Sequence, residues 1–142
     1  MQIFKTLLLA IAFFCPVFSA AAQDSGNTGK IYFVRHTGYN GMALNFHCFI
    51  DSSRVCDLKN NHYSVHEVPA GDHVVNVKIY SKELKSPKRP VTIKVEPGQV
   101  YYVKILPEKS YSFEAYLKVM TVSETTIKPV MKKCEPQTDC IL

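Results

Sequence analysis

The sequence predicts an all-β protein, an antiparallel β-sandwich of about seven to eight strands followed by a short C-terminal tail, helical or irregular. Three observations support this fold class. Apolar and polar residues alternate with a period of two in most segments between residues 31 and 119. Turn-forming residues interrupt the alternation at intervals of about eight to twelve positions. No helical period of comparable length is present. Together, these three observations favour a sandwich.

Residues 1–22 have the features of a signal peptide. Lys5 precedes an apolar run from Thr6 to Phe18, and three alanines at 20–22 give the small-x-small cleavage pattern. The run is shorter than the roughly 20 residues that a membrane span needs. We therefore expect export to the periplasm or the extracellular space, cleavage near Ala22, and a soluble mature chain without a transmembrane segment. Cys15 follows two phenylalanines, so we expect it to be discarded with the signal rather than lipidated.

The rest of the chain divides into a flexible leader (23–29), a sandwich domain (30–120) and a C-terminal segment (121–142). About 120 residues suffice for one modest core. The formal charge of +5 is mild and comes from scattered lysines. The one dense basic cluster, 82–89, reads as a solvated loop, and no basic-aromatic stripe is present, so we expect no nucleic-acid partner.

The strands follow from alternation and from β-favouring residues, and their boundaries follow from turn signals. Val68–Gly71 suits a type I turn, and Pro97-Gly98 suits the centre of a type II turn. Tyr63 and Val65 are assigned to the inward face of their strand. The expected strands cover residues 31–35, 43–50, 54–58, 62–66, 73–80, 91–95, 100–106 and 111–119.

The first hairpin decides how two cysteines face each other. A three-residue loop at 51–53 pairs Cys48 with Cys56 and Phe46 with Leu58, apolar with apolar, so we prefer it to a two-residue loop. Directly opposed residues have Cα atoms about 4.5 to 5.5 Å apart, a distance that a disulfide can span. We therefore predict a Cys48–Cys56 disulfide, with two small buried thiols as the alternative.

The C-terminal segment departs from the strand pattern. The even number of cysteines after the signal indicates disulfides in an exported chain, and a local Cys134–Cys140 clip accommodates the remaining pair. A metal-binding tail is less favoured, because zinc sites use shorter cysteine spacings. Residues 121–124 resemble a capping box that would begin a short helix. Pro129 would break such a helix, so two short turns fit equally well.

No convergent catalytic site is visible. His62 and His66 would lie about 13 Å apart along one strand at roughly 3.3 Å per residue, too far to share an ion, and we assign both to its outward face. His73 follows a turn and is expected to form a hydrogen bond at the sheet end. No nucleophile motif, phosphate-binding loop or pair of facing carboxylates occurs. We therefore expect no enzyme activity, no catalytic residue, no metal site and no cofactor.

Outward aromatic residues are the candidates for ligand contact. Alternation assigns Phe49, Tyr80, Tyr116 and one of Tyr101 and Tyr102 to outward faces. Exposed aromatic rings on a sandwich can bind sugar rings or protein partners. Packing under loops or under the C-terminal segment is the alternative, and we favour it.

Several motifs resemble domain of unknown function 2846 over about residues 29–106. They are IYFVR at 31–35, Gly41, FID at 49–51, LKNNHY at 58–63, VPAGDH at 68–73 and PGQVYY at 97–102. More loosely, the chain is similar to the PEGA-type surface modules of bacteria. The resemblance implies a small exported β-sandwich, often in lipoproteins or envelope proteins, with no assigned activity and no catalytic residues to transfer.

Two departures from the family pattern matter. The family usually has D-G-K at the first hairpin followed by V-G, whereas this chain has DSS at 51–53 followed by Val55 and Cys56. A cysteine in place of the glycine supports a disulfide particular to this chain. The family's frequent lipobox is missing, which argues against membrane anchoring. We expect a non-enzymatic structural or interaction module whose partner is an envelope protein or a glycan. Carbohydrate or peptidoglycan binding through exposed tyrosines is the main alternative.

Overall fold

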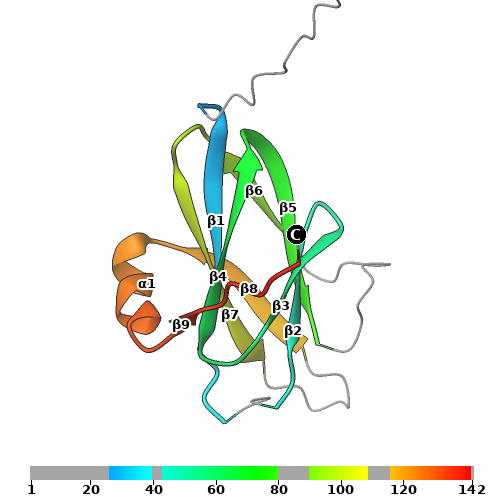
Figure 1. The fold of residues 1–142 in the computed structure, drawn as a ribbon, viewed down its shortest axis with the longest axis vertical. Helices are drawn as coiled ribbons and strands as arrows, with labels where there is room; N and C mark the ends of the chain where they lie inside the picture. Colours follow the sequence, from blue (N-terminus) through cyan, green and yellow to red (C-terminus); the bar gives the residue numbers. More distant parts are fainter. Residues whose placement is uncertain (1–25, 40–42, 80–89, 109–115, 142) are drawn as a thin grey trace, which may run out of the picture.

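A computed structural model describes residues 26–39, 43–79, 90–108 and 116–141, and these residues form nine strands and one helix in two sheets (Figure 1). Sheet A has the strand order β8-β7-β1-β4-β9, and sheet B has the order β3-β2-β5-β6. The sheets face each other across one core, so the predicted all-β sandwich is confirmed. The elements are β1 (Thr28–Arg35), β2 (Phe46–Ile50), β3 (Ser53–Leu58), β4 (His62–Pro69), β5 (Gly71–Lys78), β6 (Val91–Val95), β7 (Val100–Glu108), β8 (Tyr116–Val122), α1 (Glu124–Met131) and β9 (Glu135–Pro136).

Sheet A is mixed rather than purely antiparallel. β1 lies at its centre, antiparallel to β4 and parallel to β7, with Lys30 opposite Val100 and Arg35 opposite Ile105. Parallel neighbours need a long connection, and here the chain passes through all of sheet B and through β4 between β1 and β7. β1 begins at Thr28, inside the expected leader, and β8 ends at Val122.

The core lies between the inner faces of the two sheets. β1 and β7 contribute Ile31, Phe33, Val103 and Ile105 from sheet A, all without exposed surface. Burying an aliphatic or aromatic side chain of this size contributes about 1.5–3 kcal/mol relative to leaving it in water. Sheet B supplies the opposing residues: Phe46, Cys48, Ile50, Cys56, Leu58, Val75, Val77, Ile93 and Val95.

The β2–β3 hairpin has the predicted register but a different loop. Cys48 is opposite Cys56 and Phe46 is opposite Leu58, as expected. The loop itself has two residues, Asp51 and Ser52, both with positive φ (49° and 69°), the mirror-image turn whose twist matches a hairpin. A β-bulge at Val55 adds the extra residue that restores the predicted pairing. The three-residue loop was therefore wrong, although the register was right.

The facing of β4 is opposite to the prediction. Ser64 and His66 lie opposite Phe33 and Ile31 of β1, and opposed residues share a face, so both point toward the interior. Val65 instead points outward and is 43% exposed. The link before β4 contains Asn61 with φ of 55°. The inward residues of β3, Cys56 and Leu58, and those of β4, Ser64 and His66, are nevertheless all at even positions, so the alternation continues in phase through this link, whereas the prediction changes its phase.

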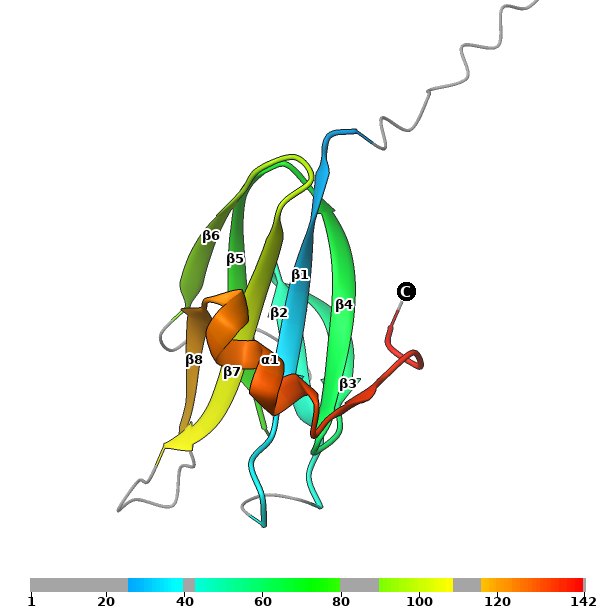
Figure 2. The same cartoon turned by 90° about the vertical axis from the view of Figure 1, so that its left-hand side faces the viewer.

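Helix α1 packs on the outer face of sheet A, over β7 (Figure 2). Ser123 is its N-cap and accepts a hydrogen bond from the backbone N–H of Thr126, so the helix starts later than a cap at Thr121 would place it. Pro129 lies inside the helix without ending it. Ile127 and Val34 are both fully buried and lie outside the main core cluster, which is consistent with a second, smaller apolar layer on this side of the sheet.

Several predictions fall outside the described residues, namely the signal peptide at 1–22, the basic loop at 82–89 and Tyr80. Within the described part of the chain, no helix has the length and apolar character needed to cross a bilayer.

Candidate functional site

The C-terminal segment closes one edge of the sandwich. β9 pairs in parallel with β4, with His62 opposite Glu135 and Tyr63 opposite Pro136. The backbone N–H groups of Glu135 and Gln137 donate to the carbonyls of Asn61 (2.9 Å) and Tyr63 (2.8 Å). The chain then passes from sheet A to β3, the edge strand of sheet B (Figure 1).

Gln137 completes this crossing with its side chain. Its amide nitrogen donates to the carbonyl of Asp57 at 3.0 Å, and its amide oxygen accepts from the backbone N–H of Lys59 at 2.9 Å. The buried amide therefore satisfies one acceptor on the open edge of β3 and one donor just beyond its end, as another strand would. An exposed Lys59–Asp139 ion pair of 2.9 Å lies beside it.

A disulfide fastens the same segment to β3. It joins Cys56 to Cys140, with an S–S distance of 2.08 Å and a Cα–Cα distance of 4.5 Å, across 84 residues of sequence. Both predicted pairings, Cys48–Cys56 and Cys134–Cys140, were therefore wrong. Cys48 does lie opposite Cys56, but the returning C-terminal segment brings Cys140 to the Cys56 sulfur. Cys48 and Cys134 are free thiols.

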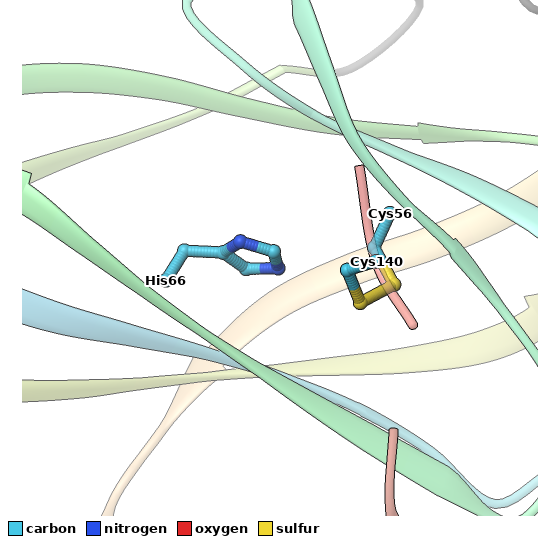
Figure 3. Close-up of side chains that lie close together, drawn as sticks. All are labelled: Cys56, His66 and Cys140. Atoms are coloured by element: carbon cyan, nitrogen blue, oxygen red, sulfur yellow. A yellow bond between two sulfur atoms is a disulfide. The ribbon is translucent and has the colours of Figure 1, made fainter. Parts of the chain in front are cut away.

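His66 lies beside this disulfide. Its imidazole, Cys56 Sγ and Cys140 Sγ present ligand-type atoms that all lie within 4.8 Å of one another. The ring is turned with a nitrogen toward the two sulfurs (Figure 3). It packs edge-on against Phe33 with centroids 5.8 Å apart, and its Nε2 shares a hydrogen bond of 3.0 Å with Ser64 Oγ. Burial lowers the pKa of His66, which keeps the ring neutral near pH 7.

Two other histidines form separate pairs with carboxylates. His73 Nδ1 lies 2.5 Å from Asp51 Oδ2 and its Nε2 lies 2.8 Å from the Pro69 carbonyl, which confirms the expected hydrogen bond at the sheet end. Burial lowers the pKa of His73, but these hydrogen bonds and the nearby Asp51 and Asp72 charges outweigh it and raise the pKa.

In the β2–β3 hairpin, His47 Nδ1 lies 2.6 Å from Asp57 Oδ1, and Arg54 Nη1 lies 3.4 Å from the same carboxylate. His47 is opposite Asp57 in the β2–β3 register, so the contact is an ordinary cross-strand pair. The histidines are thus used separately, in different parts of the sandwich.

A buried arginine holds the end of the sandwich near β2. Arg35 has no exposed surface, and its Nη1 donates to the carbonyls of Leu44 (2.6 Å) and Leu58 (2.8 Å). Its guanidinium carbon lies 3.4 Å from the centre of the Phe46 ring, a cation–π contact. Desolvation lowers the pKa of Arg35 to about 10, so the side chain stays charged at neutral pH.

Of the four predicted aromatic contact residues, the structure describes the side chains of Phe49 and Tyr101, and both are packed. Phe49 is 1% exposed, so its outward assignment does not give a ligand contact. Tyr101 packs against the core, and its hydroxyl accepts a hydrogen bond from the Glu96 backbone N–H at 3.0 Å. Tyr116 belongs to β8, and its side chain, like Tyr80, lies outside what the structure describes. Phe49 and Tyr101 are thus packed, as the favoured alternative expects, and Tyr101 packs against the core itself.

A different set of tyrosines forms a row on the outer face of sheet A. Tyr32 of β1 lies between Tyr63 of β4 and Tyr102 of β7, with ring centroids 6.1 Å and 5.1 Å away. All three side chains are half-buried, and the exposed Val65 is directly opposite Tyr32. We call Tyr32, Tyr63, Tyr102 and Val65 the tyrosine face. The sequence prediction assigns Tyr63 and Val65 to the core, so it could not identify this face.

The fold and these features define a β-sandwich domain whose own C-terminal segment closes one edge. The chain belongs to the family described as "Protein of unknown function (DUF2846)", which matches residues 25–117. The match ends before α1, β9 and Cys140, so the disulfide joins a strand of the matched region to a segment beyond it. No curated protein and no solved structure matches the chain.

Proposed function

We propose that this protein is a non-enzymatic module of the cell envelope that binds a partner through the tyrosine face. The observation that carries the proposal is the row formed by Tyr32, Tyr63 and Tyr102 across three adjacent strands. Tyrosine provides a large contact area at a low cost in side-chain entropy, and its hydroxyl tolerates both water and an interface.

The tyrosine face is rigidly supported. Tyr32 and Tyr102 are opposite residues of the parallel β1–β7 pair. Tyr63 is on β4, the strand that pairs with the other edge of β1. The hydroxyl of Tyr102 also donates a hydrogen bond to the carboxylate of Glu124 of α1, and burial, followed by the Glu124 charge, raises the pKa of Tyr102. A surface held in this way loses little freedom on binding, which favours affinity.

Envelope location is part of the proposal and rests on two observations. The first residues have the pattern of a signal peptide. The Cys56–Cys140 disulfide is a bond that persists in oxidising compartments. His47 and His73 are each paired with a different carboxylate, Asp57 and Asp51, which supports the non-enzymatic assignment because these contacts do not bring the histidines together.

Cross-linking in intact cells tests the proposal. The double variant Tyr32→Ser/Tyr102→Ser should lose cross-linked species that the wild type forms, whereas Tyr39→Ser should keep them. Tyr39 is the matched control because it is a tyrosine 90% exposed in the turn after β1 and is not part of the tyrosine face. Cross-links that persist unchanged in the double variant would contradict the use of this face.

Glycan binding is the second candidate function, and the same tyrosine face favours it, because flat aromatic surfaces stack on sugar rings. Co-sedimentation with purified peptidoglycan sacculi separates the two candidates. Retention of the wild type and Tyr39→Ser, with loss of the double variant, would establish the glycan. No co-sedimentation, together with face-dependent protein cross-links, would establish a protein partner.

A further inference from the structure

We propose that reduction of the Cys56–Cys140 disulfide turns this edge of the sandwich into a binding site for a thiophilic d¹⁰ cation, Zn²⁺ or Cu⁺, held by Cys56, Cys140 and His66. Either the disulfide or the bound metal ion would then link the C-terminal segment to β3 at the same position. The inference does not rest on the tyrosine face.

The three side chains come from three different segments that meet at one point. Cys56 is on β3 of sheet B, His66 is on β4 of sheet A, and Cys140 is on the C-terminal segment (Figure 3). Their ligand-type atoms lie within 4.8 Å of one another. Bonds of about 2.0–2.3 Å to a central ion place ligand atoms roughly 3.3–4 Å apart. The observed cluster therefore needs only small side-chain adjustments once the two sulfurs separate.

The segment that carries Cys140 is held in place by contacts other than the disulfide. The side chain of Gln137 makes two hydrogen bonds to backbone groups, at Asp57 of β3 and at Lys59 just after it, and its backbone N–H donates to the carbonyl of Tyr63 of β4. Asp139, the residue just before Cys140, forms the ion pair with Lys59. Reduction breaks none of these contacts, so both thiols stay close to His66 after the S–S bond is cut.

The ligand chemistry favours soft metals. Thiolate and neutral imidazole together suit Zn²⁺ and Cu⁺ better than hard cations such as Mg²⁺ or Ca²⁺. His66 is half-buried, and burial lowers its pKa, which leaves a nitrogen lone pair available at neutral pH. Cys140 is also half-buried, whereas Cys56 is fully buried, so an ion would enter from the Cys140 side.

The neighbouring thiol is not counted as a ligand. Cys48 is opposite Cys56 on β2, but burial strongly raises its pKa, an effect that outweighs the opposing influence of Arg35. Cys48 is also not part of the group of ligand-type atoms that Cys56, His66 and Cys140 form. Three protein ligands leave a fourth position for water on Zn²⁺, whereas Cu⁺ is satisfied by three.

The redox step balances with a dithiol reductant. The dithiol gives two electrons and two protons to the Cys56–Cys140 bond, which yields two thiols, and is itself oxidised to a disulfide. Binding of the cation then displaces the two thiol protons into solvent.

Metal titration of the purified protein tests the inference. The protein is reduced anaerobically with dithiothreitol, desalted, and titrated with Zn²⁺ or with Cu⁺ against a chromogenic chelator of each ion. We expect one equivalent to bind to the reduced protein in at least one arm and to raise its thermal midpoint, and no tight binding to the oxidised protein. The arm that competes more strongly identifies the ion.

The variants are chosen to separate ligands from bystanders. His66→Gln and Cys140→Ser should each lower the affinity at least tenfold, whereas His62→Gln and Cys134→Ser should leave it unchanged. Oxidised His66→Gln keeps its disulfide, so its folding can be checked by circular dichroism before reduction. The inference is overturned by absence of stoichiometric binding in both arms, by equal binding to the oxidised protein, or by undiminished binding to His66→Gln and Cys140→Ser.

Discussion

Removing the Cys56–Cys140 disulfide should cost this protein a large part of its stability. The bond closes a loop between residues 84 apart in sequence. The chain-entropy model assigns about 4.5 kcal/mol to a loop of this length, compared with about 2.5 kcal/mol for the short loops of the pairings expected from sequence. Hydrogen bonds from Gln137 still hold the segment, so we expect Cys140→Ser to lower the free energy of unfolding by about 3–4.5 kcal/mol. For a domain of this size that corresponds to a fall in Tm on the order of 15 °C.

The assay is urea unfolding of oxidised wild type, dithiol-reduced wild type and oxidised Cys140→Ser, followed by circular dichroism. Reduced wild type and Cys140→Ser should unfold at similar, lower urea concentrations, and Cys134→Ser should match oxidised wild type because Cys134 is a free thiol. Thiol labelling under denaturing conditions should find one more reactive cysteine in Cys140→Ser than in wild type. The reasoning would be refuted if reduction left the urea midpoint of the wild type unchanged, or if peptide mapping linked Cys48 to Cys56.

Three further predictions follow from particular contacts. The raised pKa of His73 means that its contribution to stability is complete below its unfolded pKa of about 6.5 and is lost as the pH rises through the folded pKa. The difference in unfolding free energy between wild type and His73→Gln, measured by urea unfolding, should therefore shrink between pH 5.5 and 8.5. A constant difference would contradict the pairing of His73 with Asp51. Gln137→Ala should cost about 1–3 kcal/mol, because it leaves the Lys59 N–H and the Asp57 carbonyl without their amide partner, and faster hydrogen exchange at the Lys59 amide would report the loss. Gly29→Ala should destabilise the fold, since a Cβ there would lie 2.5 Å from a methyl group of Val95 and 3.0 Å from two backbone carbonyls of the following turn; a thermal melt like that of wild type would count against this packing.

The local part of the fold could be predicted from the sequence. Alternation and turn residues located the strands within a few positions, because period-two patterning records which residues face a core. The Cys48–Cys56 register was also accessible, since apolar residues on both strands favour only one alignment.

Long-range pairings could not be predicted in the same way. Cys140 meets Cys56 because β9 adds to β4 and carries the chain across the sandwich edge, and no short segment of sequence records that route. His66 illustrates a smaller failure. The prediction changed the phase of the alternation between β3 and β4, whereas the inward residues of both strands are at even positions, and this places His66 beside the disulfide and Tyr63 on the outer face. The candidate sites depend on both effects, so sequence reasoning did not find them.

The central position of β1 has a consequence for how the chain folds. β1 is the first strand to be synthesised, but one of its two partners, β7, ends about seventy residues later in the chain. Until β7 arrives, the apolar stretch Ile31–Val34 has an open edge that other chains can pair with. Contacts of such large sequence separation are slow to form. We therefore expect folding to be slow and sensitive to protein concentration, with the pairing of β1 and β7 as the late step that removes the tendency to aggregate.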